Sequence, residues 1–215
     1  MIALINPNTS AATTASMLRI AKEAAGPGIR IEGLTAPFGA PLITTPAALA
    51  RAAEAVVALA PQLRAARAVL IAAFGDPGLS ALRDLLAVPV TGLAEAGMRE
   101  AAQGGRRFAV VTTTPDLRDG IAATAVAYGH DRFLGTWTTP GDPVALTSDA
   151  AALATALAAA CARAVDAGAE AIVIGGGPLA EAARQLAPTS HVPLIEPLPA
   201  AVRLSVARCK ERPLR

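Results

Sequence analysis

Short, unbroken apolar runs alternate with helix-length segments along the whole chain, and this alternation restricts the fold more than any other feature. The apolar runs predict strands at 2–5, 29–34, 68–73, 88–90, 108–112, 132–137, 171–174 and 192–195. The intervening segments predict helices at 11–25, 46–60, 79–86, 95–103, 117–128, 149–167, 179–186 and 199–212. Strands without polar alternation, separated by helices, are typical of parallel sheets that helices cover on both faces. We therefore expect an α/β fold.

The second half of the chain repeats the plan of the first. Val88-Pro89-Val90 and Val192-Pro193-Leu194 are 104 residues apart, and the runs 68–71 and 171–174 are 103 residues apart. A near-constant offset between elements in the same order predicts two similar lobes, each with a four-stranded parallel sheet. We assign residues 1–104 and the C-terminal helix to lobe 1, and residues 105–198 to lobe 2.

Composition excludes several classes of protein. Lys and Arg number 19 against 17 for Asp and Glu, and no basic block interleaved with aromatic residues occurs, which argues against a nucleic-acid partner. The N-terminus has no basic leader, and the alanine-rich run 150–165 is short and contains Arg163, so we expect a soluble helix there. Two cysteines are too few for a disulfide framework or a zinc site. We expect a cytoplasmic protein with no membrane partner and no metal.

Polar and glycine-rich loops follow the strands that would lie at the centre of each sheet. Ligands of open parallel sheets bind beyond the carboxyl ends of the strands. The loops at those ends are 6–10 and 74–78 in the first half, and 112–116 and 175–179 in the second. Two lobes that face each other would bring these loops to a shared cleft, where we expect the site.

Each loop allows a structural and a functional interpretation. In the first, Thr9 or Ser10 would cap the following helix, and the same helix N-terminus could receive a carboxylate or phosphate. Asp76-Pro77 is typical of a helix start, with an acid–base role for Asp76 as the alternative. The glycines at 175–177 allow either a tight turn or close approach of a ligand, but they do not form a dinucleotide-binding motif.

Neither cysteine and neither histidine is placed as a catalytic group. Cys161 falls inside the alanine-rich helix, where a small buried thiol is the ordinary case, and Cys209 falls in the last helix. His130 is expected in a solvated turn and His191 in the loop before the last strand.

Several strings together resemble the hydantoin and allantoin racemases of the Asp/Glu/hydantoin racemase superfamily. They are Ile5-Asn6-Pro7-Asn8-Thr9-Ser10, the segment 71–79 (IAAFGDPGL), the segment 107–112 (RFAVVT), Tyr128-Gly129 and the segment 170–175 (EAIVIG). The resemblance extends over almost the whole chain. It implies a cofactor-independent racemase or isomerase with two four-stranded lobes, an active site between them, and association into homo-oligomers.

The resemblance also implies two catalytic cysteines, one from each lobe, which remove and return the proton at the α-carbon of the substrate. Thiols suit this reaction because a helix N-terminus tunes their acidity. The corresponding positions here are Ala73 and Gly176. Neither residue carries an acid or base, so we expect two-thiol racemisation to be absent or very weak.

Three explanations stay open. The protein is a divergent enzyme that uses another group, such as Asp76, a threonine or a water; or a binding relative, a sensor or pseudoenzyme; or an engineered inactive variant. In each case we expect a small carboxylate, hydantoin or ureide to bind at one set of residues: Asn8, Thr9, Ser10, Phe74, Gly75, Thr112, Thr113 and Gly177, with further backbone N–H groups around Ala73 and Gly176.

Overall fold

The computed structural model describes residues 1–176 and 179–211, which form two compact units. Unit 1 contains Met1–Ile43, Ala47–Ala96 and the segment from Leu198 onward. Unit 2 contains Thr44–Pro46 and Gly97–Pro197. The sequence predicts a different kind of division, into two lobes of similar topology with the boundary between residues 104 and 105. That division stays a prediction.

The sheet of unit 1 has four parallel strands in the order β2-β1-β3-β4. They are β1 (Ile2–Asn6), β2 (Ile31–Thr35), β3 (Ala68–Ile71) and β4 (Val90–Gly92). Every residue of β1 and β3 is buried. The two central strands are therefore covered on both faces, which is why their sequences are unbroken apolar runs.

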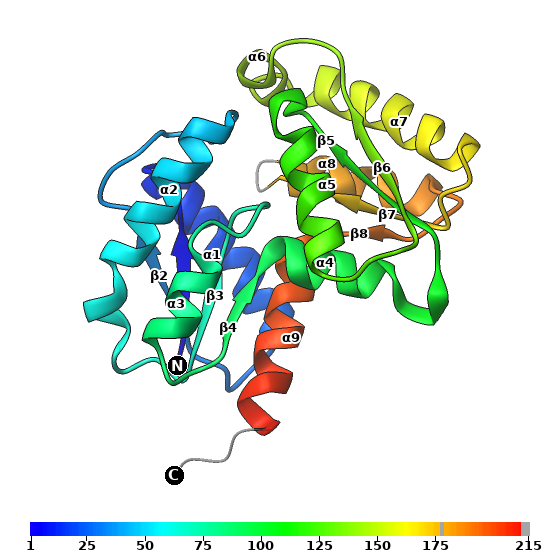
Figure 1. Cartoon of the computed structure of the whole chain (residues 1–215). Helices are drawn as coiled ribbons and strands as arrows, with labels where there is room; N and C mark the ends of the chain where they lie inside the picture. Colours follow the sequence, from blue (N-terminus) through cyan, green and yellow to red (C-terminus); the bar gives the residue numbers. More distant parts are fainter. Residues whose placement is uncertain (177–178, 212–215) are drawn as a thin grey trace. The chain divides into compact units, whose positions relative to one another are not determined.

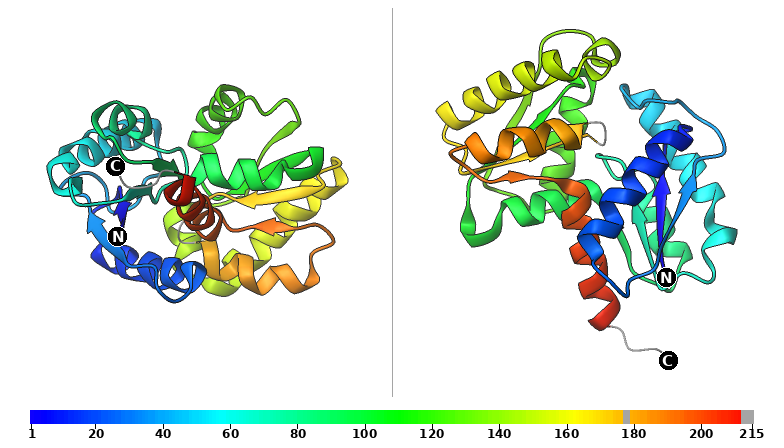
Figure 2. Two further views of the ribbon diagram at one scale, coloured as in Figure 1. Left: turned by 90° about the horizontal axis from the view of Figure 1, so that it is seen from below. Right: turned by 180° about the vertical axis from the view of Figure 1, so that it is seen from behind.

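Helices cover both faces of this sheet (Figure 1). Figure 2 shows α1 (Ala11–Ala25) on one face and α2 (Pro46–Ala58) and α3 (Leu79–Leu85) on the other. This arrangement follows from right-handed crossovers, because the chain moves one way across the sheet from β1 to β2 and the opposite way from β2 to β3 and β4. Helix α4 (Leu93–Ala101) follows β4, and α9 (Pro197–Glu211) returns to unit 1.

Unit 2 has the same topology, with a parallel sheet in the order β6-β5-β7-β8. The helices α7 and α8 pack on this sheet through a core that includes Val111, Leu157, Ile172 and Leu179. The elements of unit 2 are β5 (Phe108–Thr112), α5 (Arg118–Ala127), β6 (Phe133–Thr138), α6 (Pro143–Thr147), α7 (Ala150–Asp166), β7 (Ala171–Ile174), α8 (Ala180–Leu186) and β8 (Leu194–Ile195). The predicted fold class, two similar four-stranded parallel sheets flanked by helices, is confirmed.

The predicted elements all occur, and their boundaries differ by a few residues. Strands β4 and β8 begin two residues later than predicted, after Pro89 and Pro193. The two prolines lack an N–H, but their carbonyl oxygens accept bonds from Val69 and Ile172 of the neighbouring strands. The short helix α6 was not predicted, although Asp142 caps it and Pro143 occupies its first turn.

The alanine-rich run forms α7, whose buried face includes Leu153, Leu157 and Cys161. Among the described residues, no helix combines the length and apolar character that a membrane span requires.

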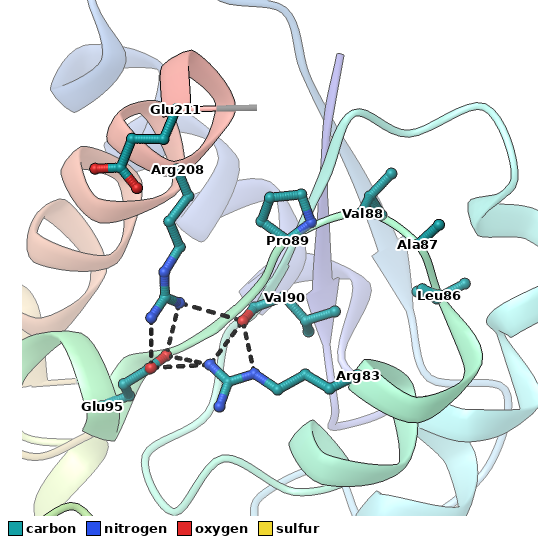
Figure 3. Close-up of a pocket in the computed structure, with 9 residues that line it drawn as sticks. All are labelled: Arg83, Leu86, Ala87, Val88, Pro89, Val90, Glu95, Arg208 and Glu211. Atoms are coloured by element: carbon teal, nitrogen blue, oxygen red, sulfur yellow. Dashed lines mark hydrogen bonds and ion pairs between the residues drawn. The ribbon is translucent and has the colours of Figure 1, made fainter. Parts of the chain in front are cut away.

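Within unit 1, the end of α9 is attached to α3 and α4 by one carboxylate and two guanidinium groups (Figure 3). Glu95 accepts bonds of 2.6 and 2.9 Å from Arg208 of α9, and two of 2.8 Å from Arg83 of α3. Both arginines also donate to the carbonyl oxygen of Val90. Burial alone would raise the pKa of Glu95, but the hydrogen bonds from Arg208 and Arg83 outweigh it and hold the pKa below its usual value.

Candidate functional site

The loop that follows β1 is held by the side chain of Asn6, which is fully buried. Its Nδ2 lies 2.8 Å from Oδ1 of Asn8 and 3.0 Å from both the carbonyl oxygen of Ser10 and Oγ1 of Thr14. Its Oδ1 accepts a bond from the backbone N–H of Asn8. The loop at the carboxyl end of β1 is therefore preorganised by its own amide groups.

The three binding residues expected in this loop are used differently. Ser10 is the N-cap of α1, because its Oγ accepts a bond of 3.2 Å from the N–H of Thr13. Oδ1 of Asn8 accepts from the N–H of Ser10. Nδ2 of Asn8 and Oγ1 of Thr9 form no hydrogen bond with another described residue. These two groups are free to meet a ligand, whereas the hydroxyl of Ser10 serves the helix.

Asp76 caps a different helix from the one that its sequence indicates. The N-cap of α3 is Gly78, which makes no side-chain capping bond. The two carboxylate oxygens of Asp76 instead accept bonds of 2.8 Å from the N–H groups of Ala94 and Glu95, at the start of α4. A Cβ on Gly92 would lie 2.1 Å from Cγ of Asp76, so the carboxylate lies directly on the β4–α4 turn. The prediction that Asp76 caps α3 is wrong.

The turn after β3 presents backbone donors. Asp76 donates its N–H to the carbonyl oxygen of Ala73, and Ala72 donates to Ile5. Between them, the N–H groups of Ala73, Phe74 and Gly75 donate to no other described residue. Gly75 has φ of 107° and Asp76 has φ of 50°, so the backbone turns sharply here. Successive free N–H groups in such a turn form a concave site for an anion or a carbonyl oxygen.

The carboxyl end of the sheet in unit 2 carries hydroxyl groups. Oγ1 of Thr112 lies 3.0 Å from Oγ1 of Thr114 and accepts a hydrogen bond of 3.4 Å from the backbone N–H of Thr114. Thr113 is buried, and its hydroxyl forms no hydrogen bond with another described residue. Thr139 donates its N–H to the carbonyl oxygen of Thr112. The ends of β5 and β6 therefore lie side by side.

Gly176 is in the loop at the carboxyl end of β7, next to β5. A Cβ at this residue would lie 3.0 Å from Cδ1 and 3.1 Å from Cγ of Leu179, whose side chain is 1% exposed. Leu179 thus occupies part of the space that any larger residue at position 176 would need. Gly177, expected to bind substrate, lies outside the described residues.

The sequence analysis missed three polar features at this edge of unit 2. Arg118 of α5 donates to Oγ1 of Thr138, and Glu196, directly after β8, pairs with Arg184 at 2.9 Å. The hydroxyl of Thr139 is buried and has no hydrogen-bond partner among the described residues. Each of these follows a predicted strand or begins a predicted helix, so the strand-end rule could have found them.

The two cysteines lie in helices as expected, whereas His130, expected in a solvated turn, is half-buried. Burial raises the pKa of the Cys161 thiol to about 11, and Cys209 is half-buried in α9. Burial also lowers the pKa of His130, whose ring meets Phe108 edge-on. Within the described ranges, no group of three or more His, Cys, Asp or Glu residues could hold a metal ion.

Comparison with known proteins gives consistent matches over nearly the whole chain. The family model for Asp/Glu/hydantoin racemase matches residues 2–205. A hydantoin racemase of Paenarthrobacter aurescens is 32% identical over 211 residues, which cover 95% of this chain and 89% of that protein. The structure of an allantoin racemase from Klebsiella pneumoniae has a TM-score of 0.89 and 34% identity, covering 96% of this chain and 86% of that one. For an allantoin racemase from Pseudomonas fluorescens the TM-score is 0.88 and the identity 28%, with 98% and 91% covered.

Proposed function

The chain belongs to the Asp/Glu/hydantoin racemase family, and from that membership we propose that it binds a small hydantoin, ureide or related carboxylate without racemising it by a two-thiol route. The ligand class comes from the hydantoin and allantoin racemases that this chain is similar to. The proposal concerns a binding relative of these enzymes, with a divergent enzyme as the alternative.

One observation carries the proposal. The turn after β3 offers three free N–H groups, at Ala73, Phe74 and Gly75, but no side chain at position 73 that could move a proton. Free N–H groups favour the carbonyl or carboxylate oxygens of a ureide. A methyl group at residue 73 and a hydrogen at Gly176 exchange no proton with the α-carbon. The turn therefore keeps the binding chemistry and lacks the acid–base chemistry.

Polar side chains at the strand ends of each unit, taken separately, support the same interpretation. In unit 1, Nδ2 of Asn8 and Oγ1 of Thr9 are free for a ligand, and in unit 2 the hydroxyl of Thr113 is. Asp76 is a poor replacement base, since both of its oxygens already accept backbone bonds. General acid–base groups contribute about 10²- to 10⁴-fold each, so their loss leaves little racemisation.

The test measures binding and proton exchange separately. Allantoin and a panel of 5-substituted hydantoins are titrated by calorimetry, and exchange of the α-proton is followed by NMR in D₂O against a blank without protein. We expect heat of binding for at least one ligand and exchange no faster than the blank. Exchange above the blank that disappears in folded Asp76→Asn protein would establish the divergent enzyme instead, and the absence of any binding would refute both.

Restoring the thiols provides a matched gain-of-function variant. The combined Ala73→Cys and Gly176→Cys variant should exchange the α-proton of a ligand that the wild-type protein binds, whereas either single variant should exchange it more slowly. If the double variant binds the ligand and remains inert, the loss of cysteines is not the reason for inactivity.

A further inference from the structure

A cavity of about 450 Å³ lies at the amino ends of the strands of the unit 1 sheet, at the edge opposite the strand-end loops. Its volume lies in the usual range of about 300–1,000 Å³ for small-molecule sites. Three short segments before β1, β2 and β3 meet the last turns of α9 here. The lining residues are Met1, Ile2, Gly28, Ile29, Arg30, Arg67, Val206, Cys209 and Lys210.

The charged residues of this lining are all basic. Arg30 precedes β2, Arg67 precedes β3, and Lys210 belongs to α9, so the fold brings together cations from three segments that are far apart in the sequence. Arg30 pairs with Glu32, which is outside the lining. The side chains of Arg67 and Lys210 form no ion pair and no hydrogen bond with another described residue. Within the part of the chain that the structure describes, these two positive charges have no carboxylate partner.

Another cavity of unit 1, around Glu95, contains a cluster of compensated charges. Its volume is about 510 Å³, and it is lined by Arg83 and Arg208 together with Glu95 and Glu211 (Figure 3). The guanidinium groups of these arginines donate hydrogen bonds to the carboxylate of Glu95 and the carbonyl oxygen of Val90. That cluster attaches α9 to α3 and α4, whereas the lining of the cavity with Arg67 contains cations and no carboxylate.

Apolar side chains form the rest of the lining, chiefly Ile2, Ile29 and Val206. Arginine and lysine bind phosphate and carboxylate groups through charge-assisted hydrogen bonds. An apolar surface beside such donors suits a ligand with an anionic head and a small apolar body. We propose that this cavity is a second binding site, which takes an organic anion of that kind and is separate from the strand-end loops.

Cys209 lines the cavity and reports on its occupancy, because a bound ligand would cover the thiol. Burial raises the pKa of the Cys161 thiol to about 11 and keeps it protonated. Because the thiolate is the nucleophile, Cys161 should react slowly with an alkylating reagent, so that modification reports on Cys209. The experiment follows N-ethylmaleimide modification of Cys209 in the full-length protein by peptide mass spectrometry. Phenyl phosphate is the probe, with inorganic phosphate, phthalate and benzyl alcohol as comparison ligands.

We expect phenyl phosphate to slow the alkylation of Cys209, by about 11-fold at ten times its Kd if the bound form is fully protected. Phthalate, a carboxylate with a similar body, tests the head group, and benzyl alcohol, which has no charge, should not protect. Protection in the wild-type protein should also weaken as salt is added, because the cations are exposed to solvent. Equal protection by inorganic phosphate would overturn the apolar part of the proposal.

Charge reversal identifies the site. Arg67→Glu with Lys210→Glu should abolish protection, with the ratio of protected to unprotected rates taken within each variant. Arg64→Glu is the matched control, since Arg64 is an exposed arginine of the same unit outside the lining, and it should keep the protection. Protection that persists in the folded double variant, or no protection in the wild type, would overturn the proposal. Because the readout is at Cys209, it does not depend on whether the strand-end loops bind a ureide.

Discussion

Replacing Asp76 by Asn tests whether this residue serves the structure of unit 1. The wild-type carboxylate is 6% exposed and accepts one bond from each of the Ala94 and Glu95 N–H groups. Asparagine adopts the positive φ of this position as readily as aspartate does, so backbone strain cancels in the comparison. The variant therefore isolates the charge and the second acceptor oxygen.

The expected cost follows from the hydrogen bonds. Bonds to a charged group contribute about 1.5–3 kcal/mol each, and the asparagine oxygen retains one of them at neutral strength. Loss of the negative charge at the start of α4 adds about 0.3–1 kcal/mol. We expect the free energy of unfolding to fall by about 3–5 kcal/mol. With a urea m-value of about 3 kcal/mol/M, the midpoint should fall by about 1–2 M.

The assay is urea unfolding followed by far-ultraviolet circular dichroism. Asp84→Asn is the control, because Asp84 is exposed on α3 in the same unit and its replacement should change stability by less than about 0.5 kcal/mol. A midpoint for Asp76→Asn as close to wild type as that of the control would refute the capping role. The residue would then be available for acid–base chemistry.

Two further changes test other parts of the structure. Glu95→Gln should lower the free energy of unfolding by about 1.5–3 kcal/mol near neutral pH. Because folding lowers the pKa of Glu95, the stabilisation by its carboxylate is present above the ordinary value of 4.5 and is lost as the pH falls through the folded-state pKa. The urea midpoints of variant and wild type should therefore converge in acid, and a constant difference between them would contradict this. Gly176→Ala should cost about 1–3 kcal/mol because Leu179 is buried and 3.0 Å from the new Cβ. Gly120→Ala, with open space around the new Cβ, should stabilise α5 by about 0.5–1 kcal/mol. Thermal unfolding in which both variants are more stable than the wild type would show that Leu179 moves aside.

Local sequence patterns were sufficient to predict the strands and the helices longer than a few residues. The unbroken apolar runs at 68–71 and 171–174 predict central strands because a strand buried on both faces has no polar alternation. Their constant spacing predicts the repeated topology. The boundaries at Pro89 and Pro193 were less accurate, since a proline's role in a sheet depends on which neighbouring strand donates an N–H to its carbonyl oxygen.

Within the candidate site, the sequence indicated which loops to examine but not how each polar group is used. Thr9 or Ser10 was expected to cap α1, and Ser10 does so through a partner three residues away. Backbone donors were expected around Ala73, and the position of Thr139 after a strand could have been noted. The local sequence does not show that the N–H groups of Ala73, Phe74 and Gly75 and the hydroxyl of Thr139 form no hydrogen bond with another described residue. Whether such groups have partners depends on residues that are distant in the chain.

The sequence by itself determined the α/β class, the doubled plan, the polar strand ends and the absence of cysteine at positions 73 and 176, because these features depend on periodicity and residue identity. Only the tertiary structure decided that Asp76 caps α4: β3 and β4 are neighbours in the sheet, which brings the loop after one strand to the helix after the other. The same is true of the cavity shared by Arg30, Arg67 and Lys210, since parallel strands start at one edge and α9 returns there from the far end of the chain.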